Sequence, residues 1–183
     1  YAKPHHLAKL IIKNIGMQNL DYHRTKFIIP FFVPMPFVWE HFLENLFMNY
    51  YDKKVRIVKQ DRHDAWLIHG KVHPIKPDIV TYKDGEISAI IDAKYMKKLD
   101  VGGKEIYQLA FYLNYLNHST GYAILPYEEI EDYEINVPKQ NISIKIRHIP
   151  IDEYLNILYS KKPSREIKEE ISSKLKEIVP IIP

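Results

Sequence analysis

The sequence predicts a mixed α/β fold, and three observations carry this prediction. Segments with the period-two alternation of strands lie between segments with the 3.6-residue period of helices. Strand patterns come first in the central part, then a helix, then further strands, an order that favours a mixed sheet with helices over a bundle or a sandwich. The 183 residues are 46% hydrophobic and 27% charged, which is typical of one soluble globular domain.

The composition excludes several classes of site. The chain has no cysteine, which excludes thiol nucleophiles, CxxC redox chemistry, iron–sulfur clusters and thiolate zinc sites. The net charge of +3 allows a nucleic-acid partner but does not require one. No run approaches the ~18 apolar residues of a membrane span, and lysines and histidines interrupt the apolar face of residues 1–15, unlike a signal peptide. We therefore expect a soluble cytoplasmic protein with no membrane partner.

Helical spacing of apolar residues predicts five helices. The N-terminal segment stops at Gly16, which suits a helix closed by a glycine. The strongest signal covers residues 37–51, where two adjacent apolar stripes predict a largely buried helix. Further helices are expected at residues 103–117, 152–160 and 164–179.

Short alternating or apolar runs bounded by turn residues predict the strands. They are expected at residues 55–59, 65–69, 75–82, 86–95, 121–125, 133–137 and 142–149. Residues 1–150, with the N-terminal helices, are then expected to form the core domain. Residues 151–183 are expected to form a C-terminal helical extension packed on or beside it.

A carboxylate and an ammonium group occur together at the end of an apolar strand. Side chains alternate faces along a strand, so Asp92 and Lys94 point to the same side. Ile90 and Ile91 precede them and favour a central strand, where a charge without a purpose is unfavourable. The plainer alternative is a surface ion pair on an edge strand.

Whether Asp78 joins this pair depends on the register of the intervening hairpin. A two-residue turn at residues 84–85 pairs Asp78 with Ile91, which turns Asp78 away from Asp92. A three-residue turn at residues 83–85 shifts the register by one and places Asp78 on the face of Asp92. We predict the three-residue turn or an equivalent bulge.

Two carboxylates and a lysine on one face have a defined chemical use. Carboxylates at the right separation hold Mg²⁺ and leave coordination positions for water and a phosphate oxygen. The metal makes hydroxide available near neutral pH, and a lysine orients the attacking water and stabilises the developing negative charge. The pattern therefore predicts a metal-dependent site for phosphodiester hydrolysis at Asp78, Asp92 and Lys94.

The motifs of this region resemble those of one nuclease family. In chain order they are Glu40 in its helix, Gln60 at a strand end, Lys76-Pro77-Asp78-Ile79-Val80, Asp92-Ala93-Lys94-Tyr95 and Tyr107-Gln108-Leu109-Ala110-Phe111-Tyr112. This order is similar to that of the McrC family, the nuclease components of modified-cytosine restriction systems, over roughly residues 7–126. The resemblance implies the PD-(D/E)XK, or restriction-endonuclease-like, core with a mixed central sheet flanked by helices.

The resemblance also implies a role for each matching residue. Asp78 and Asp92 would hold Mg²⁺, with Mn²⁺ as a substitute, and Glu40 would add an acidic group from the preceding helix. Lys94 would be the catalytic lysine, and Gln108 would position water or phosphate. The plainer alternatives are a solvated helix glutamate at Glu40 and an ordinary helix residue at Gln108.

Contacts to DNA are expected next to this site. Lys97, Lys98 and Lys104 follow the active-site strand directly, and phosphate contacts are expected from them. Tyr112 lies one helical turn beyond Gln108 and is a further candidate for DNA binding, with ordinary helix packing as its alternative.

The predicted function is a Mg²⁺-dependent DNA endonuclease that resembles the cleavage subunit of a modification-dependent restriction system. Its expected partners are double-stranded DNA, an AAA+ GTPase or ATPase motor of the McrB type, and a second copy of the chain in a homodimer. The chain has no GxxxxGK(S/T) loop, so the nucleotide would bind to the motor. Two alternatives stay open. One is a stand-alone PD-(D/E)XK nuclease for DNA repair, junction resolution or mobile-element defence, and the other is a catalytically idle nuclease fold that binds DNA or supports assembly.

Overall fold

The computed structural model describes residues 33–69, 71–97, 103–126 and 131–181, with only the backbone at residues 66–68. In chain order, its elements are α2 (Met35–Tyr50), β1 (Arg56–Lys59), β2 (His63–Ile68), β3 (Lys71–Ile75), β4 (Ile79–Lys83), β5 (Glu86–Ala93), α3 (Lys104–Tyr115), β6 (Thr120–Leu125), β7 (Tyr133–Val137), the 3₁₀ turn η2 (Pro138–Gln140), β8 (Ile142–His148), α4 (Ile151–Leu158) and α5 (Ser164–Ile178). The helix expected before Gly16 lies outside the described residues.

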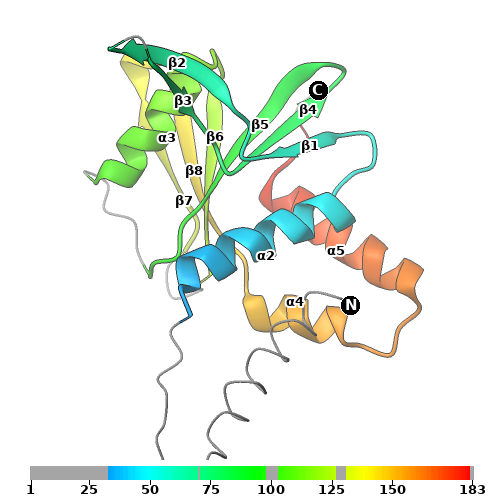
Figure 1. Cartoon of the computed structure of the whole chain (residues 1–183). Helices are drawn as coiled ribbons and strands as arrows, with labels where there is room; N and C mark the ends of the chain where they lie inside the picture. Colours follow the sequence, from blue (N-terminus) through cyan, green and yellow to red (C-terminus); the bar gives the residue numbers. More distant parts are fainter. Residues whose placement is uncertain (1–32, 70, 98–102, 127–130, 182–183) are drawn as a thin grey trace, which may run out of the picture. The chain divides into compact units, whose positions relative to one another are not determined.

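A mixed six-stranded sheet forms the centre of the fold (Figure 1). Its strand order is β1-β4-β5-β6-β8-β7, and β2 pairs only with β3 in a separate two-stranded sheet. The β5–β6 and β6–β8 pairs are parallel, whereas β1–β4, β4–β5 and β7–β8 are antiparallel. The prediction of a mixed α/β fold with a central sheet flanked by helices is confirmed. Among the described residues, no helix combines the length and apolar character that crossing a membrane requires.

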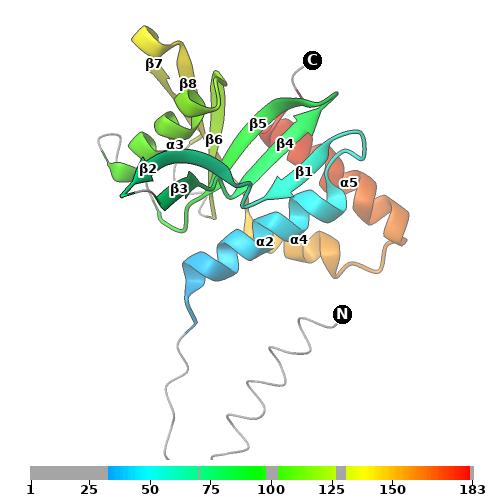
Figure 2. The same ribbon diagram turned by 45° about the horizontal axis from the view of Figure 1, so that its top comes forward.

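Helices cover both faces of the sheet (Figure 2). On one face α2, α4 and α5 bury an apolar cluster that includes Trp39, Ile91 and Leu175. On the other face α3 buries a second cluster that includes Ile90 and Leu109. Adjacent residues of β5 therefore point into opposite clusters, which explains why this strand reads as a continuous apolar run. The two helices of residues 151–183 contribute to the same cluster as α2.

The single strand expected at residues 75–82 is wrong in its extent. The structure divides this segment between the end of β3 and the start of β4, and β3 itself was not expected. Pro74 interrupts the strand pattern of β3, and Pro77 cannot donate a ladder hydrogen bond where the chain passes from one sheet to the other.

The β4–β5 hairpin has a two-residue turn, so the expected three-residue turn is wrong. Lys83 pairs with Glu86, and Asp84 and Gly85 between them have φ values of 53° and 90°. Positive φ at both central positions defines the type I′ geometry that Asp-Gly favours in tight hairpins.

The alternative to the three-residue turn, a bulge, is present at the third residue of β5. Tyr82 pairs with Ile87, but Thr81 pairs with Ala89, so Ser88 is left without a partner. The Ser88 hydroxyl is buried and shares a 2.8 Å hydrogen bond with the Thr81 hydroxyl. Beyond the bulge the register continues to Ile79 opposite Ile91. One further step sets Asp78 opposite Asp92, so both residues lie on the same face of the sheet.

Candidate active site

The candidate site lies where β5 ends and β4 begins, on the face of the sheet covered by α3. Asp92 is on β5 and is only 2% exposed, and Lys94 follows the strand. The Lys94 backbone N–H donates to the Ile124 carbonyl at 3.0 Å, which extends the pairing of β5 with β6 past the end of the strand. The backbone of this part of the site is therefore fixed by the central sheet.

Lys94 connects the sheet to α3 through a chain of polar contacts. Its Nζ lies 2.6 Å from Asp92 Oδ2 and donates to Gln108 Oε1 at 3.2 Å. Gln108 Nε2 in turn donates to the Tyr112 hydroxyl at 2.7 Å. The structure thus brings the expected Asp92, Lys94, Gln108 and Tyr112 together in one network.

Lys94 keeps its positive charge in this network. Burial is the largest single influence and lowers the pKa of Lys94, but the charge and the hydrogen bond of the Asp92 carboxylate raise it, and the net shift is upward. The carboxylates of Asp78 and Glu105 act in the same direction. The Nζ group is therefore an ammonium that donates hydrogen bonds.

Asp78 faces the same space from the start of β4. Its Oδ2 accepts a 2.7 Å hydrogen bond from the Ala93 backbone N–H, which connects the two strands beyond the last paired residues. Burial, the neighbouring Asp92 charge and then Glu40 raise the pKa of Asp78 to about 7. Burial is also the largest influence that raises the pKa of Asp92, against the opposing effect of Lys94.

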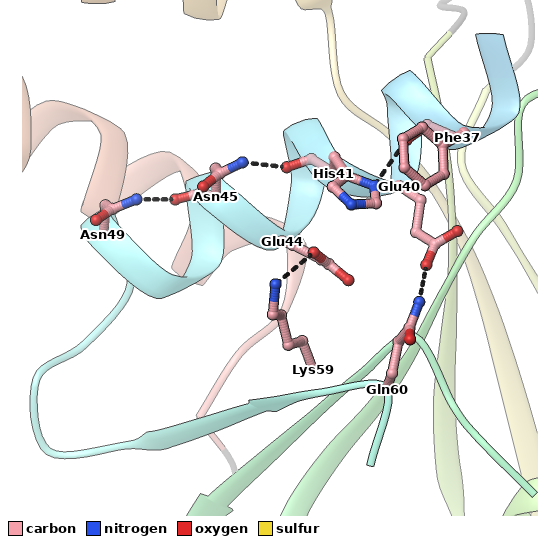
Figure 3. Close-up of polar contacts among 8 residues, drawn as sticks. All are labelled: Phe37, Glu40, His41, Glu44, Asn45, Asn49, Lys59 and Gln60. Carbon is pink, nitrogen blue, oxygen red and sulfur yellow. Dashed lines mark hydrogen bonds and ion pairs between the residues drawn. The ribbon is translucent and has the colours of Figure 1, made fainter. Parts of the chain in front are cut away.

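Glu40 approaches Asp78 and Asp92 from α2, which covers the other face of the sheet. The indole N–H of Trp39 donates to the Ile124 carbonyl at 3.1 Å and holds this turn of α2 against β6. Glu40 Oε1 then accepts a 2.8 Å hydrogen bond from Gln60 Nε2 (Figure 3). The Gln60 backbone N–H donates to the Asp78 carbonyl at 2.7 Å, so Gln60 connects α2 to the start of β4.

A second glutamate on α2, Glu44, has a structural partner. It is buried, and its Oε2 lies 3.4 Å from Lys59 Nζ at the end of β1 (Figure 3). Replacing Lys59 by methionine leaves this buried carboxylate without its cation. The Lys59 side chain is 49% exposed, so solvent screens the pair, and we expect a loss of only about 1–2 kcal/mol in the free energy of unfolding.

Urea denaturation checks this prediction. The exposed Lys54→Met variant is the matched control and should unfold as the wild type does. Adding Glu44→Gln to Lys59→Met should recover most of the loss, because the uncompensated charge is then removed. Equal unfolding free energies for Lys59→Met and the wild type would contradict the prediction.

The donor set of the site fits a divalent cation. Asp78 and Asp92 are desolvated carboxyls, each with a raised pKa, and within the described part of the chain Lys94 is the one cation beside them. Carboxylate oxygens are the ligands that Mg²⁺ prefers, commonly one or two together with water and phosphate oxygens. The described residues contain no preformed group of three or more acidic or histidine ligands. A cation held by this pair would therefore keep positions for water and substrate.

Glu105 is a residue of the site that the sequence reasoning missed. Glu105, Gln108 and Tyr112 follow the i, i+3, i+7 spacing and lie along one face of α3. Burial is the largest influence on the pKa values of two neighbouring groups, and it raises the pKa of Asp92 but lowers that of Lys94. The Glu105 carboxylate is close enough to raise both pKa values. The helical spacing between Glu105 and Gln108 is the sequence signal that could have identified it.

The expected DNA contacts are spread around this site. Lys97 and Lys104 are exposed, and Lys104 lies 4.0 Å from Glu105. Lys98 lies outside the described residues. Tyr112 is buried, and its hydroxyl accepts the hydrogen bond from Gln108, so it supports the polar network of the site. Binding of DNA by these four residues stays a prediction.

Comparison with known families adds an independent finding. The family model described as "McrBC 5-methylcytosine restriction system component" matches residues 1–128, which include every acidic, lysine and glutamine residue of the site described above. No curated protein matches the chain. Since the match covers well over half of the 183 residues, this protein belongs to the McrBC family of 5-methylcytosine restriction system components.

Proposed function

We propose that this protein is the DNA-cleaving component of its restriction system, a Mg²⁺-dependent endonuclease that hydrolyses phosphodiester bonds. The observation that carries the proposal is the convergence of Asp78, Asp92 and Lys94 on one face at the end of the central sheet, next to Gln108 of α3. Membership of a restriction family supports the choice of DNA as substrate. An idle nuclease fold would have no use for two neighbouring carboxyl groups, one of them buried.

The side chains have distinct tasks in this reaction. Asp78 and Asp92 would hold Mg²⁺, which supplies a Lewis acid for the phosphate and an acidified water when bound. The Lys94 ammonium donates a hydrogen bond to the attacking water or to a non-bridging phosphate oxygen and stabilises the charge that develops there. Gln108 Oε1 accepts a hydrogen bond from Lys94 Nζ and so helps to hold it in place, and the Tyr112 hydroxyl accepts one from Gln108. Water adds to phosphorus, the bond to the leaving sugar oxygen breaks, and a phosphate monoester and a hydroxyl are formed.

The proposed partners follow from the same family. Double-stranded DNA is the substrate, and an AAA+ GTPase or ATPase of the McrB type would deliver it to the site. The chain has no nucleotide-binding loop of its own, which supports a division of tasks between two proteins.

Plasmid cleavage tests the proposal. The chain is incubated with unmodified and with 5-methylcytosine-containing plasmid, with and without the motor protein of the same system. We expect nicked or linear DNA with Mg²⁺ or Mn²⁺ and none with EDTA. Cleavage without the motor would favour a stand-alone nuclease. Intact plasmid under every one of these conditions would overturn the proposal.

A further inference from the structure

The β2–β3 hairpin is an insertion between two strands that are neighbours in the sheet. β1 and β4 pair antiparallel, and their last pair is Lys59 with Ile79. Two to five residues are enough to connect such strands. Here residues 60–78 make the connection and form a two-stranded sheet of their own (Figures 1 and 2). The chain thus leaves the site at Gln60 and returns to it at Asp78.

The base of this hairpin is held firmly. Ile75 at the end of β3 is buried in the apolar cluster under α3. The Tyr115 hydroxyl of α3 donates to the Asp64 backbone carbonyl, and the Tyr82 hydroxyl of β4 donates to the Asp61 carboxylate. These contacts fix the direction in which the hairpin leaves the body of the protein.

The outer half of β3 is not packed against the described part of the chain. Lys71, Val72 and His73 are consecutive strand residues, so they alternate between the two faces, and all three are exposed. Both faces of this half of the strand are therefore exposed to solvent. An isolated two-stranded hairpin contributes little to stability, so a role in contacting another molecule explains this segment better.

The charge of the outer part of the hairpin favours a polyanion. Asp64, at the start of β2, lies 3.7 Å from Arg62. Residues 65–77 contain no acidic residue, and their charged side chains are Lys71 and Lys76, accompanied by His69 and His73. All four are exposed, and within the described ranges neither lysine forms an ion pair. Two cations without counter-ions next to a hydrolytic site can neutralise phosphates of the bound substrate.

The shape and reach of the hairpin suit duplex DNA. A two-stranded ribbon fits the major groove of B-DNA. From Asp78 to Lys71 there are seven residues, so at about 3.3 Å per residue the end of the hairpin lies within about 23 Å of the site. At about 3.4 Å per base pair this distance corresponds to about seven base pairs.

We propose that the β2–β3 hairpin is an arm that contacts duplex DNA beside the cleaved phosphate, with Lys71 and Lys76 on the phosphate backbone. The inference rests on the proposed function in one respect, since it takes DNA to be the substrate. It assigns to the histidine-rich segment around residues 69–73 a role in holding DNA, within about seven base pairs of the cleavage position.

Charge reversal at Lys71 tests the proposal through binding. Fluorescence anisotropy with a 30-base-pair duplex in EDTA, where cleavage is excluded, compares the wild type with Lys71→Glu. Lys139→Glu, in the exposed η2 turn, is the matched control with the same change in net charge. We expect Lys71→Glu to bind about five- to tenfold more weakly near 0.1 M salt, with the slope of log K against log salt reduced by about one, and Lys139→Glu to bind as the wild type does.

Three results of this experiment would overturn the proposal. The first is equal binding by Lys71→Glu and the wild type; if Lys71→Glu is then defective only in stimulation by the motor protein, the hairpin contacts a protein partner. The second is an equal loss in Lys71→Glu and Lys139→Glu, which would indicate an effect of net charge alone. The third is a wild-type chain that does not bind the duplex.

Site-directed cross-linking locates the arm and separates its failure from that of the proposed function. The chain has no cysteine, so Val72→Cys creates a unique position for a photoactivatable cross-linker, with Lys139→Cys as control. We expect cross-links from position 72 within about seven base pairs of the cleavage site and none from position 139. Cross-links from position 72 in a protein that never cleaves would support the arm while the proposed function fails. Cleavage without such cross-links would support the function and overturn the arm.

Discussion

Replacing Lys94 by alanine is expected to reduce DNA cleavage about a thousandfold while DNA binding is retained. The ammonium of Lys94 is held between Asp92 and Gln108, and its raised pKa keeps it charged where the phosphate would lie. Removing one positioned electrostatic donor typically lowers a rate by about 10²–10³, and removing a proton-transfer group lowers it by about 10²–10⁴. Lys94→Arg should be almost as inactive, because the wider guanidinium does not fit a side-chain position that is 15% exposed.

Single-turnover cleavage with Mg²⁺ and DNA binding in EDTA are the two measurements for this variant. Loss of Lys94 leaves the Asp92 carboxylate without its cation, so the unfolding temperature of the metal-free variant should also fall by a few degrees. Binding is therefore the measurement that separates a catalytic defect from unfolding. Lys139→Ala is the control and should cleave at the wild-type rate. Wild-type cleavage by Lys94→Ala would remove the lysine from the mechanism.

Much of the fold followed from periodicity, because central strands and buried helices carry strong apolar patterns. The strand at residues 133–137 has the predicted limits, and α2 begins and ends within two residues of its prediction. β3 was missed because its residues do not alternate between a buried and an exposed face, as its burial shows. A hairpin that extends away from the core lacks the signal on which sequence reasoning depends.

The site shows a similar division between local and non-local information. Asp92 and Lys94 were placed together correctly, because their spacing on one strand decides their common face. The position of Asp78 depended on a bulge that is formed by Ser88, whose hydroxyl bonds to Thr81 and whose backbone carbonyl bonds to the His118 ring. The contact between Ser88 and His118 joins segments that are distant in sequence. The sequence therefore indicated that a bulge was needed to bring Asp78 to the face of Asp92, but not where it would form.

Replacing Asp78 by asparagine is expected to stabilise the metal-free protein at pH 8 and to abolish cleavage. Burial and the charges of Asp92 and Glu40 raise the pKa of Asp78 from 3.8 to about 7. At pH 8 the folded protein therefore carries an unfavourable carboxylate at position 78, which lowers the free energy of unfolding by an amount on the order of a few kcal/mol. Asparagine removes that charge and keeps a side-chain oxygen to accept the hydrogen bond from the Ala93 N–H. It also removes an anionic oxygen from the proposed metal ligands.

The pH dependence of this difference has a definite sign. The pKa of Asp78 is higher in the folded state, about 7, than in the unfolded state, near 3.8, so between these values the folded protein binds the extra proton. The stability of the wild type relative to Asp78→Asn should therefore fall as pH rises from about 4 to about 7 and stay level above it.

Thermal unfolding in EDTA across that range measures the effect. Asp78→Asn should unfold several degrees above the wild type at pH 8, and the two should converge near pH 4. Asp84→Asn is the matched control, since Asp84 lies in the exposed turn with a positive φ that asparagine also adopts, and it should follow the wild type at every pH.

Added Mn²⁺ should raise the unfolding temperature of the wild type and of Asp84→Asn but not of Asp78→Asn. A less stable Asp78→Asn at pH 8 would show that the carboxylate contributes to folding, whereas an undiminished response to Mn²⁺ would show that Asp78 is not needed to hold the metal. The unfolding temperature at pH 8 and its response to Mn²⁺ together decide whether Asp78 lowers the stability of the metal-free protein and binds a cation.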